Sequence, residues 1–368
     1  MMYLDFGATS LHKPRQVGEA VRWAMDQCAN PGRGGYEASK RAAQTVYQCR
    51  ERAGRIFECG LEQVVFTSNC THGLNIAIRS LVKPGMRVVV SGFEHNAVTR
   101  PLHGLGAELL VAGRKLFDWD DTLNRFEDSL KKVEAAVFTH VSNVFGYILP
   151  VEAMAKLCRE KKIPFIIDAA QSAGSIPVSL KNLGADYIAM PGHKGLLGPQ
   201  GTGLLLCGSS GEPLLMGGTG SDSIRQDMPE YLPERLEAGT LNVPGIAGLS
   251  AGLRYLEREG VEKIGKREHQ QVVACVAGLK KLGCKVFHGP HQAGTVSFLP
   301  GADCEEFAEA LGGLGIAVRA GLHCAPLAHE SAGTLESGTV RVSFGYDAGK
   351  NMSRHLLSSV SKLLDMKF

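Results

Sequence analysis

Lys194 is the side chain best placed for covalent chemistry. It lies in MPGHKGLLGPQGTG, directly after His193, and the surrounding glycines let the backbone turn tightly and approach a ligand. An amine inside a cleft, with a histidine and an acid nearby, can form a Schiff base with an aldehyde cofactor. Because most lysines are solvated surface residues, this assignment depends on which other polar residues lie near Lys194.

Asp168 is the acid that would accompany it. It ends the apolar run PFIID, where an unpaired buried carboxylate would be costly. The sequence therefore predicts a cationic partner, and a protonated pyridine nitrogen would serve. The alternative is a helix N-cap following a strand.

A phosphate site is predicted in TSNCTHGLN, where an apolar strand passes into a helix. Cys70, Thr71 and His72 could offer backbone N–H groups and a hydroxyl to a phosphate at the helix N-terminus. Serine and threonine are common N-caps in any protein, so the prediction of a phosphate site here depends on the other polar residues expected in the same crevice.

Cys324 is the candidate nucleophile. It lies in RAGLHCAPLAH, a segment rich in Gly, Ala, Pro and His, where a neighbouring histidine or arginine favours the thiolate. An inert cysteine beside a chance histidine is the alternative. Arg341, in GTVRVSFGYD on a late strand, could clamp a carboxylate through two parallel hydrogen bonds, unless it is an ordinary surface arginine.

Short apolar runs that alternate with helix-like stretches would position these residues. Such runs predict a mostly parallel sheet in an α/β fold, because the helices between them supply the crossovers. The predicted strands are Val64–Ser68, Arg87–Ser91, Ala135–Val141, Pro164–Asp168, Asp186–Met190 and Gly203–Cys207, and the helices are Thr71–Leu81, Val151–Lys161 and Ser179–Leu183.

Polar residues follow five of these strands. Ligands of open parallel sheets bind beyond the carboxyl ends of the strands, so we expect the five groups to face one crevice. They are Ser68 with Thr71, Glu94 with His95, Ser142 with Asn143, Asp168 with Gln171, and His193 with Lys194.

The pattern changes after about Gly245. A long amphipathic stretch, Ala247–Leu282, precedes an apolar run at Gly294–Leu299, a helix around Cys304–Leu314, a strand at Val340–Phe344 and a terminal helix. Because 368 residues exceed what one core usually holds, we expect two domains. Residues 14–248 would form a large α/β domain, and residues 1–13 with 249–368 a smaller α+β domain.

Composition narrows the class of protein. Hydrophobic residues make up 44% and charged residues 21%, which is typical of globular enzymes. The 40 Lys and Arg nearly balance the 37 Asp and Glu without any basic run, which argues against nucleic-acid and membrane partners. MMYLDFGATS has no leader character, so we expect a cytoplasmic protein. Ten cysteines without a CxxC pair indicate reduced thiols rather than disulfides or a metal site.

Together these residues resemble the class V aminotransferase-fold family, and within it the cysteine desulfurases and related selenocysteine lyases. The resemblance runs from YLDFGATS to RVSFGYD and is most specific in DAAQSAG, PGHKGLLGPQGTG, LEAGTLN and RAGLHCAPL. It implies a pyridoxal-phosphate-dependent transferase of fold type I, like aspartate aminotransferase. It also implies a homodimer with active sites at the subunit interface.

The resemblance also implies roles for individual residues. The catalytic set would be Lys194, which carries pyridoxal 5'-phosphate and shuttles protons, His95, which stacks on the ring, and Cys324, which attacks the substrate sulfur and carries it as a persulfide. The remaining cofactor ligands would be Asp168 at the ring nitrogen, Gln171 at the ring hydroxyl, and Cys70, Thr71, His193 and the partner subunit's Thr240 around the phosphate. The substrate side would hold Asn143 and Arg341 at the carboxylate, with Arg319 and Arg33 as weaker candidates.

The predicted reaction is therefore conversion of L-cysteine to L-alanine, with the sulfur passed from Cys324 to an acceptor protein. A selenocysteine lyase is the nearest alternative, followed by another lyase or a transaminase of the family, which would need no cysteine nucleophile. A nucleotide-binding module is disfavoured because no GxGxxG opens a first helix and no GxxxxGK[ST] loop occurs. A non-catalytic scaffold would have no reason to keep Lys194, Asp168, His95 and Cys324. His72 departs from the family pattern, which commonly has an acidic residue there.

Overall fold

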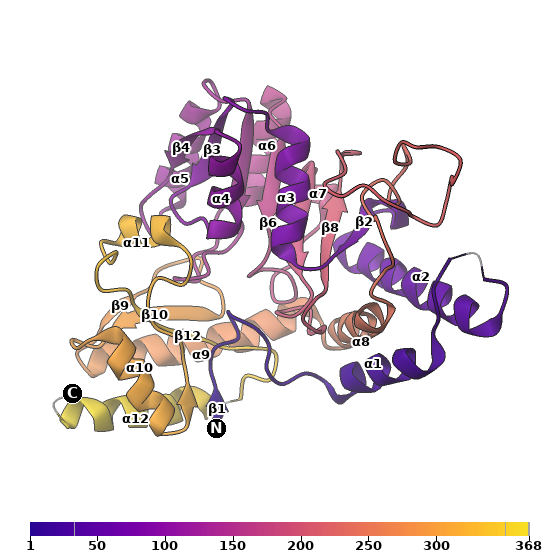
Figure 1. Ribbon diagram of the computed structural model, residues 1–368. Coiled ribbons are helices and arrows are strands. Elements are labelled where there is room, and N and C mark those ends of the chain that lie inside the picture. The colour runs from indigo at the N-terminus through magenta and orange to yellow at the C-terminus, as the bar shows by residue number, and fades with distance from the viewer. Residues whose placement is uncertain (33, 350, 367–368) are drawn as a thin grey trace.

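A seven-stranded sheet forms the centre of the protein in the computed structural model, which describes residues 1–32, 34–349 and 351–366 (Figure 1). The strand order is β2-β8-β7-β6-β5-β3-β4. The strands are β2 (Val64–Thr67), β3 (Arg87–Ser91), β4 (Glu108–Ala112), β5 (Ala135–Thr139), β6 (Phe165–Asp168), β7 (Tyr187–Pro191) and β8 (Gly203–Cys207). Within this sheet β8 is antiparallel to both of its neighbours, and the other strands share one direction. The predicted α/β class with a mostly parallel sheet is confirmed.

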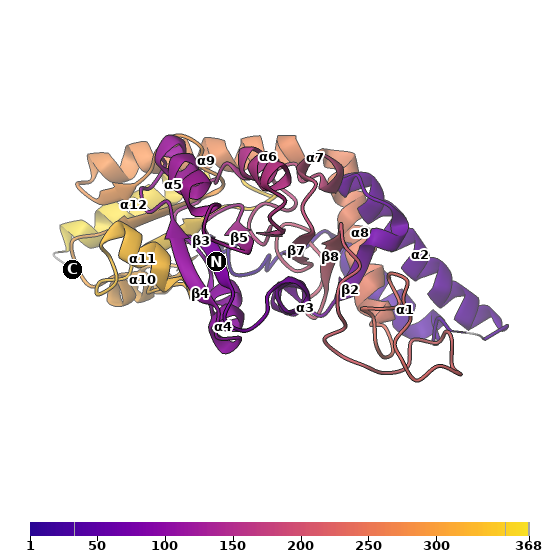
Figure 2. The same ribbon diagram turned by 90° about the horizontal axis from the view of Figure 1, so that it is seen from above.

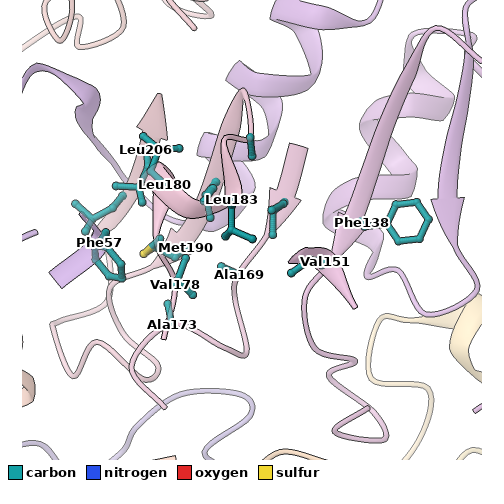
Figure 3. Close-up of a cluster of buried hydrophobic side chains, with 14 of the residues drawn as sticks. Phe57, Phe138, Val151, Ala169, Ala173, Val178, Leu180, Leu183, Met190 and Leu206 are labelled. Carbon is teal, nitrogen blue, oxygen red and sulfur yellow. The ribbon is translucent and has the colours of Figure 1, made fainter. Parts of the chain in front are cut away.

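Helices cover both faces of this sheet. Figure 2 shows α3 (Cys70–Leu81) and α4 (Asn96–Gly104) on one side, and α5 (Trp119–Ser129), α6 (Val151–Lys161) and α7 (Leu180–Leu183) on the other. Strands buried on both faces need apolar side chains in both directions, so they appear in sequence as continuous apolar runs. On one face Phe138, Val151 and Met190 join a single hydrophobic cluster (Figure 3). The sheet is therefore buried between two layers of helices.

Three helices at one end of the sheet pack against each other: α1 (Arg15–Gln27), α2 (Glu37–Phe57) and α8 (Val243–Glu259). A short 3-10 turn, η1 (Leu61–Gln63), leads into β2. The connection from β8 to α8 contains no helix or strand and extends away from the sheet edge (Figure 1).

A second sheet lies on the other side of the molecule. Its three antiparallel strands have the order β12-β10-β9 (Figure 1). Helices α9 and α10 pack against these strands and α12 packs against both helices, whereas α11 contributes Ala328 to the hydrophobic cluster of the large sheet. The bounds are β9 (Lys285–Phe287), β10 (Thr295–Leu299), β12 (Val340–Ser343), α9 (Val261–Lys281), α10 (Cys304–Gly313), α11 (Pro326–Ala332) and α12 (Met352–Asp365). The start of the chain belongs spatially with this part, because β1 (Met2–Tyr3) pairs with β11 (Ile316–Ala317).

The elements differ from the predicted ones in several places, and no ranges were predicted for α1, α2, α4 and α5. The stretch from Ala247 to Leu282 contains two helices, because Gly260 adopts a positive φ of 84° that ends α8 before α9 begins. The edge strand β4 was not predicted. The domain boundary expected at residue 248 falls within α8 and stays a prediction. Within the described ranges, no helix combines the length and apolarity that a membrane span requires.

Candidate active site

A cavity of about 230 Å³ opens at the carboxyl ends of the parallel strands. Each of the five predicted polar groups contributes at least one residue to its wall, which also receives residues from the chain start and the C-terminal part. The predicted site residues that line it are Cys70, Thr71, His95, Asn143, Asp168, Gln171, His193, Lys194, Arg319, Cys324 and Arg341. Sheet topology therefore gathers residues that are spread over most of the sequence.

Lys194 and Asp168 reach this cavity from neighbouring strands. Asp168 is the last residue of β6 and pairs in register with Ala189 of β7, the strand that leads to Lys194. Burial lowers the pKa of the Lys194 amine, and the carboxylate of Asp168 opposes that shift. Asp168 is 2% exposed, and no described residue donates a hydrogen bond to its Oδ2. The site thus presents an amine and a free carboxylate oxygen to one cavity.

The N-terminus of α3 forms one end of the cavity. Asn69 caps the helix, because its Oδ1 accepts the N–H of His72 at 2.8 Å. No described residue accepts the backbone N–H groups of Cys70 and Thr71, so these two remain available to an anion. The prediction that the N–H of His72 would be offered to a phosphate is wrong, because Asn69 already accepts it. Its ring turns back to Ser68, whose N–H donates to Nδ1 at 3.2 Å.

His193 lies beside this end of the cavity and is neutral. Burial, and then the charge of Lys194, lower its pKa to about 4. Its Nδ1 is 3.0 Å from the hydroxyl of Thr9, and its carbonyl accepts the N–H of Ser10 at 3.0 Å. His193 can therefore bind a phosphate by hydrogen bonding but brings no positive charge at neutral pH.

His95 and Gln171 occupy other walls of the cavity. His95 caps α4, and its Nδ1 accepts the N–H of Ala97 at 3.0 Å. Burial lowers the pKa of His95, which favours the neutral ring. Because Nδ1 accepts a hydrogen bond, the neutral ring carries its proton on Nε2. Gln171 donates from Nε2 to the carbonyl of Gly7 at 2.9 Å, which fixes the chain start against the cavity.

Arg341 brings a positive charge to one corner of the cavity. The residue is 1% exposed, and its Nη2 lies 2.6 Å from Asp5 Oδ1 while Nη1 donates to the carbonyl of Asn143 at 3.0 Å. Its Nε–H has no partner among the described residues. Arg319 pairs with Arg341 through the backbone and adds a second cation to the wall. A carboxylate placed here would satisfy the unpaired N–H and the excess positive charge.

Sequence reasoning assigned no role to Asp5, although it is the one acid in the otherwise apolar and small segment YLDFGATS. It also did not foresee the contact of Asn143, whose Nδ2 donates to the carbonyl of His323 at 2.7 Å. Nothing in the sequence brings residues 143 and 323 together, because the contact depends on how the two halves of the chain are packed.

Cys324 is exposed at the mouth of the cavity on a constrained loop. Both His323 and Cys324 adopt positive φ, at 50° and 56°, and the carbonyl of Cys324 accepts the N–H of Asn96 at 2.8 Å. Burial, and then the charge of Arg341, lower the pKa of His323 to about 2, so this histidine carries no charge that could favour a thiolate. The arginines that line the same cavity as Cys324 are Arg319 and Arg341.

Several expected residues lie elsewhere. Glu94 is fully buried behind the sheet end, accepts from Ser91 and Thr139, and does not line the cavity. Thr240 is exposed in a separate hollow of about 1040 Å³, away from Lys194 of the same chain. Arg33 lies outside the described residues.

This fold and this site define a known class of protein. Residues 2–351 match the family model described as aminotransferase class-V, and the chain belongs to that family. A probable cysteine desulfurase of Pyrococcus abyssi is 34% identical, with 94% of this chain and 89% of that protein covered. One of Methanothermobacter thermautotrophicus is 32% identical, with 94% and 90% covered. The apo structure of a cysteine desulfurase from Thermococcus onnurineus superposes with a TM-score of 0.91 at 32% identity, covering 99% of this chain and 95% of that one.

Proposed function

We propose that this protein is a pyridoxal 5'-phosphate enzyme that converts L-cysteine to L-alanine and takes the sulfur onto Cys324. One observation carries the proposal: the amine of Lys194 and the free Oδ2 of Asp168 line the same cavity, and the thiol of Cys324 lies at its mouth. The relatives named as cysteine desulfurases support this choice of reaction.

The residues around the cavity fit pyridoxal phosphate. The unpaired N–H groups of Cys70 and Thr71, with neutral His193, would bind the phosphate. Lys194 would bind the aldehyde, and Asp168 the ring nitrogen. His95 would pack on the ring, and Gln171 would lie beside its hydroxyl. When bound, this cofactor supplies an aldehyde that condenses with amines and a ring that withdraws electrons from the substrate α carbon.

The protein groups would then divide the reaction between them. Arg341 would hold the substrate carboxylate, with the second amide hydrogen of Asn143 as a further donor. Lys194, whose lowered pKa favours the neutral amine, would take the α proton. The thiolate of Cys324 would attack the substrate sulfur, so that a sulfur–sulfur bond forms as the carbon–sulfur bond breaks and its electron pair goes to carbon. The products would be alanine, after proton return, and a persulfide on Cys324.

A second copy of the chain would complete the phosphate site. Thr240 is exposed and lies in a hollow apart from its own Lys194. In the homodimer that we propose, Thr240 would reach the cofactor phosphate of the partner. The exposed position of Cys324 suits delivery of its sulfur to an acceptor protein in the cytoplasm.

The test is a paired assay of alanine release from cysteine and from selenocysteine. We expect the parent protein to turn over cysteine, and Cys324→Ala to lose this activity while still binding pyridoxal phosphate. Cys59→Ala, which removes a half-buried thiol outside the cavity wall, serves as the matched control. Parent-like cysteine turnover by Cys324→Ala would show that the thiol has another role. A parent protein that acts on selenocysteine alone would be a selenocysteine lyase.

A further inference from the structure

Cys70 is a second thiol in the wall of the cavity, and the reaction proposed above leaves its side chain without a role. It is the first residue of α3, and its side chain is buried against the end of β6. The thiol Sγ lies 3.4 Å from Oδ1 of Asp168, in hydrogen-bonding range for sulfur. The contact joins the element proposed to bind the cofactor phosphate to the carboxylate proposed to bind the ring.

The protonation state of this thiol decides what the contact does. Burial raises the pKa of Cys70 well above its ordinary value, and the adjacent Asp168 carboxylate raises it further. The sulfur therefore keeps its proton at neutral pH and donates it to the carboxylate oxygen. A protonated, buried thiol is a poor nucleophile, so Cys70 does not duplicate the chemistry of exposed Cys324.

The two oxygens of Asp168 consequently differ in their surroundings. Oδ1 accepts the backbone N–H of Ala170 at 2.8 Å in addition to the thiol of Cys70. No described residue donates to Oδ2. Two donors on one oxygen, arriving from different elements, fix the rotation of the carboxylate about its own axis and leave the second oxygen free for a cation.

We infer that Cys70 is a positioning residue, which orients the Asp168 carboxylate so that Oδ2 meets the ring nitrogen of the cofactor. This inference rests on the proposed function, since it takes pyridoxal phosphate as the occupant of the cavity. A serine at position 70 could still donate, although its shorter carbon–oxygen bond leaves the hydroxyl farther from Oδ1. An alanine would leave Oδ1 with a single donor and the carboxylate free to turn.

The first measurement needs no cofactor. In the infrared spectrum of the apoprotein, the S–H stretch lost in Cys70→Ala should lie at the low frequency of a thiol that donates to a carboxylate. Asp168→Asn should move this band upward, because the amide oxygen is a weaker acceptor. A Cys70 band that is unaffected by Asp168→Asn would overturn the inference.

The second measurement is the affinity of the apoprotein for pyridoxal phosphate, followed by quenching of protein fluorescence. We expect Cys70→Ala to weaken binding roughly three- to tenfold, and Cys70→Ser to recover part of that loss. Cys158→Ala, a buried cysteine of α6 outside the cavity wall, should bind like the parent. Equal affinity of parent and Cys70→Ala would overturn this inference and leave the proposed function intact. A parent protein that binds no pyridoxal phosphate would overturn both.

Discussion

The side-chain amide of Asn143 donates a 2.7 Å hydrogen bond to the backbone carbonyl of His323, and so ties the loop after β5 to the loop that carries Cys324. A second bond, from the N–H of Asn96 to the carbonyl of Cys324, holds the same loop from α4. The backbone that carries the thiol is thus held by the loop after β5 and by the start of α4, and it has a left-handed conformation at His323 and Cys324. Both hydrogen bonds would have to break before this loop could move away from Asn143 and Asn96.

Asn143→Asp should loosen this loop. A carboxylate in place of the amide cannot donate to the His323 carbonyl and would repel it, at a cost of about 1–3 kcal/mol. Amide hydrogen exchange of residues 321–325 should become faster, and alkylation of Cys324 should change in rate. Asn124→Asp, at an exposed position of α5, is the control. Unchanged exchange in Asn143→Asp would mean that other contacts fix the loop.

Arg341→Lys should raise KM for cysteine by roughly tenfold or more, with a smaller effect on kcat. Lysine cannot keep the bond to Asp5 and the bond to the Asn143 carbonyl while also presenting an N–H to the cavity. Steady-state kinetics at several cysteine concentrations separates the two constants. A fall in kcat at constant KM would place Arg341 in the chemical step rather than in binding.

His193 should stay neutral throughout the physiological range, because burial and Lys194 lower its pKa to about 4. Its ring proton resonances should be constant from about pH 5 to about pH 8, and His193→Gln identifies them by difference. The folded-state pKa lies below the unfolded value, so this group destabilises the protein only as the pH falls below about 6.5. A ring that titrates near neutrality would instead bring a positive charge to the proposed phosphate site.

Glu268→Gln should remove a pH dependence of stability. Burial raises the pKa of Glu268 from 4.5 to about 8, so between these values the folded protein holds a proton that the unfolded chain releases. The stabilisation that comes from this bound proton is fully present below pH 4.5. Between pH 4.5 and about 8 the free energy of unfolding falls by about 1.4 kcal/mol per pH unit. Urea unfolding across this range should show the parent losing stability relative to the variant. Glu262→Gln, exposed on the same helix, should behave like the parent.

Glu237→Ala should destabilise the segment that carries Thr240. Glu237 pairs at 2.5 Å with buried Arg50 and accepts the N–H of Phe66 at 2.6 Å, so its loss leaves a buried cation unpaired. We expect a loss of about 3–5 kcal/mol in urea unfolding. Glu257→Ala, which breaks the more exposed pairs to Arg52 and Arg55, should cost about 1 kcal/mol or less. Similar losses of unfolding free energy in Glu237→Ala and Glu257→Ala would show that burial does not make the first ion pair more important for stability than the others.

Sequence patterns predicted the strands that are buried on both faces, since these appear as continuous apolar runs. They missed β4, because an edge strand with a half-exposed face, ELLVA, lacks that signal. They located Lys194 and Asp168 because parallel strands end at one edge of a sheet. They could not give the Asp5–Arg341 pair or the Asn143–His323 contact, which join distant parts of the chain and depend on packing. The neutral state of His323 likewise follows from burial, which no local pattern reports.

The pair of Asp5 and Arg341 joins residues 336 positions apart, and β1 lies beside β11 in the same way. During synthesis Arg341 is added 336 residues after Asp5. All seven strands of the large sheet lie between Val64 and Cys207, so they are synthesised before Arg341, and the corner formed by Asp5 and Arg341 can be completed only after them. A nascent chain that has not yet reached Arg341 therefore lacks the ion pair with Asp5, even where every strand of the large sheet has been made.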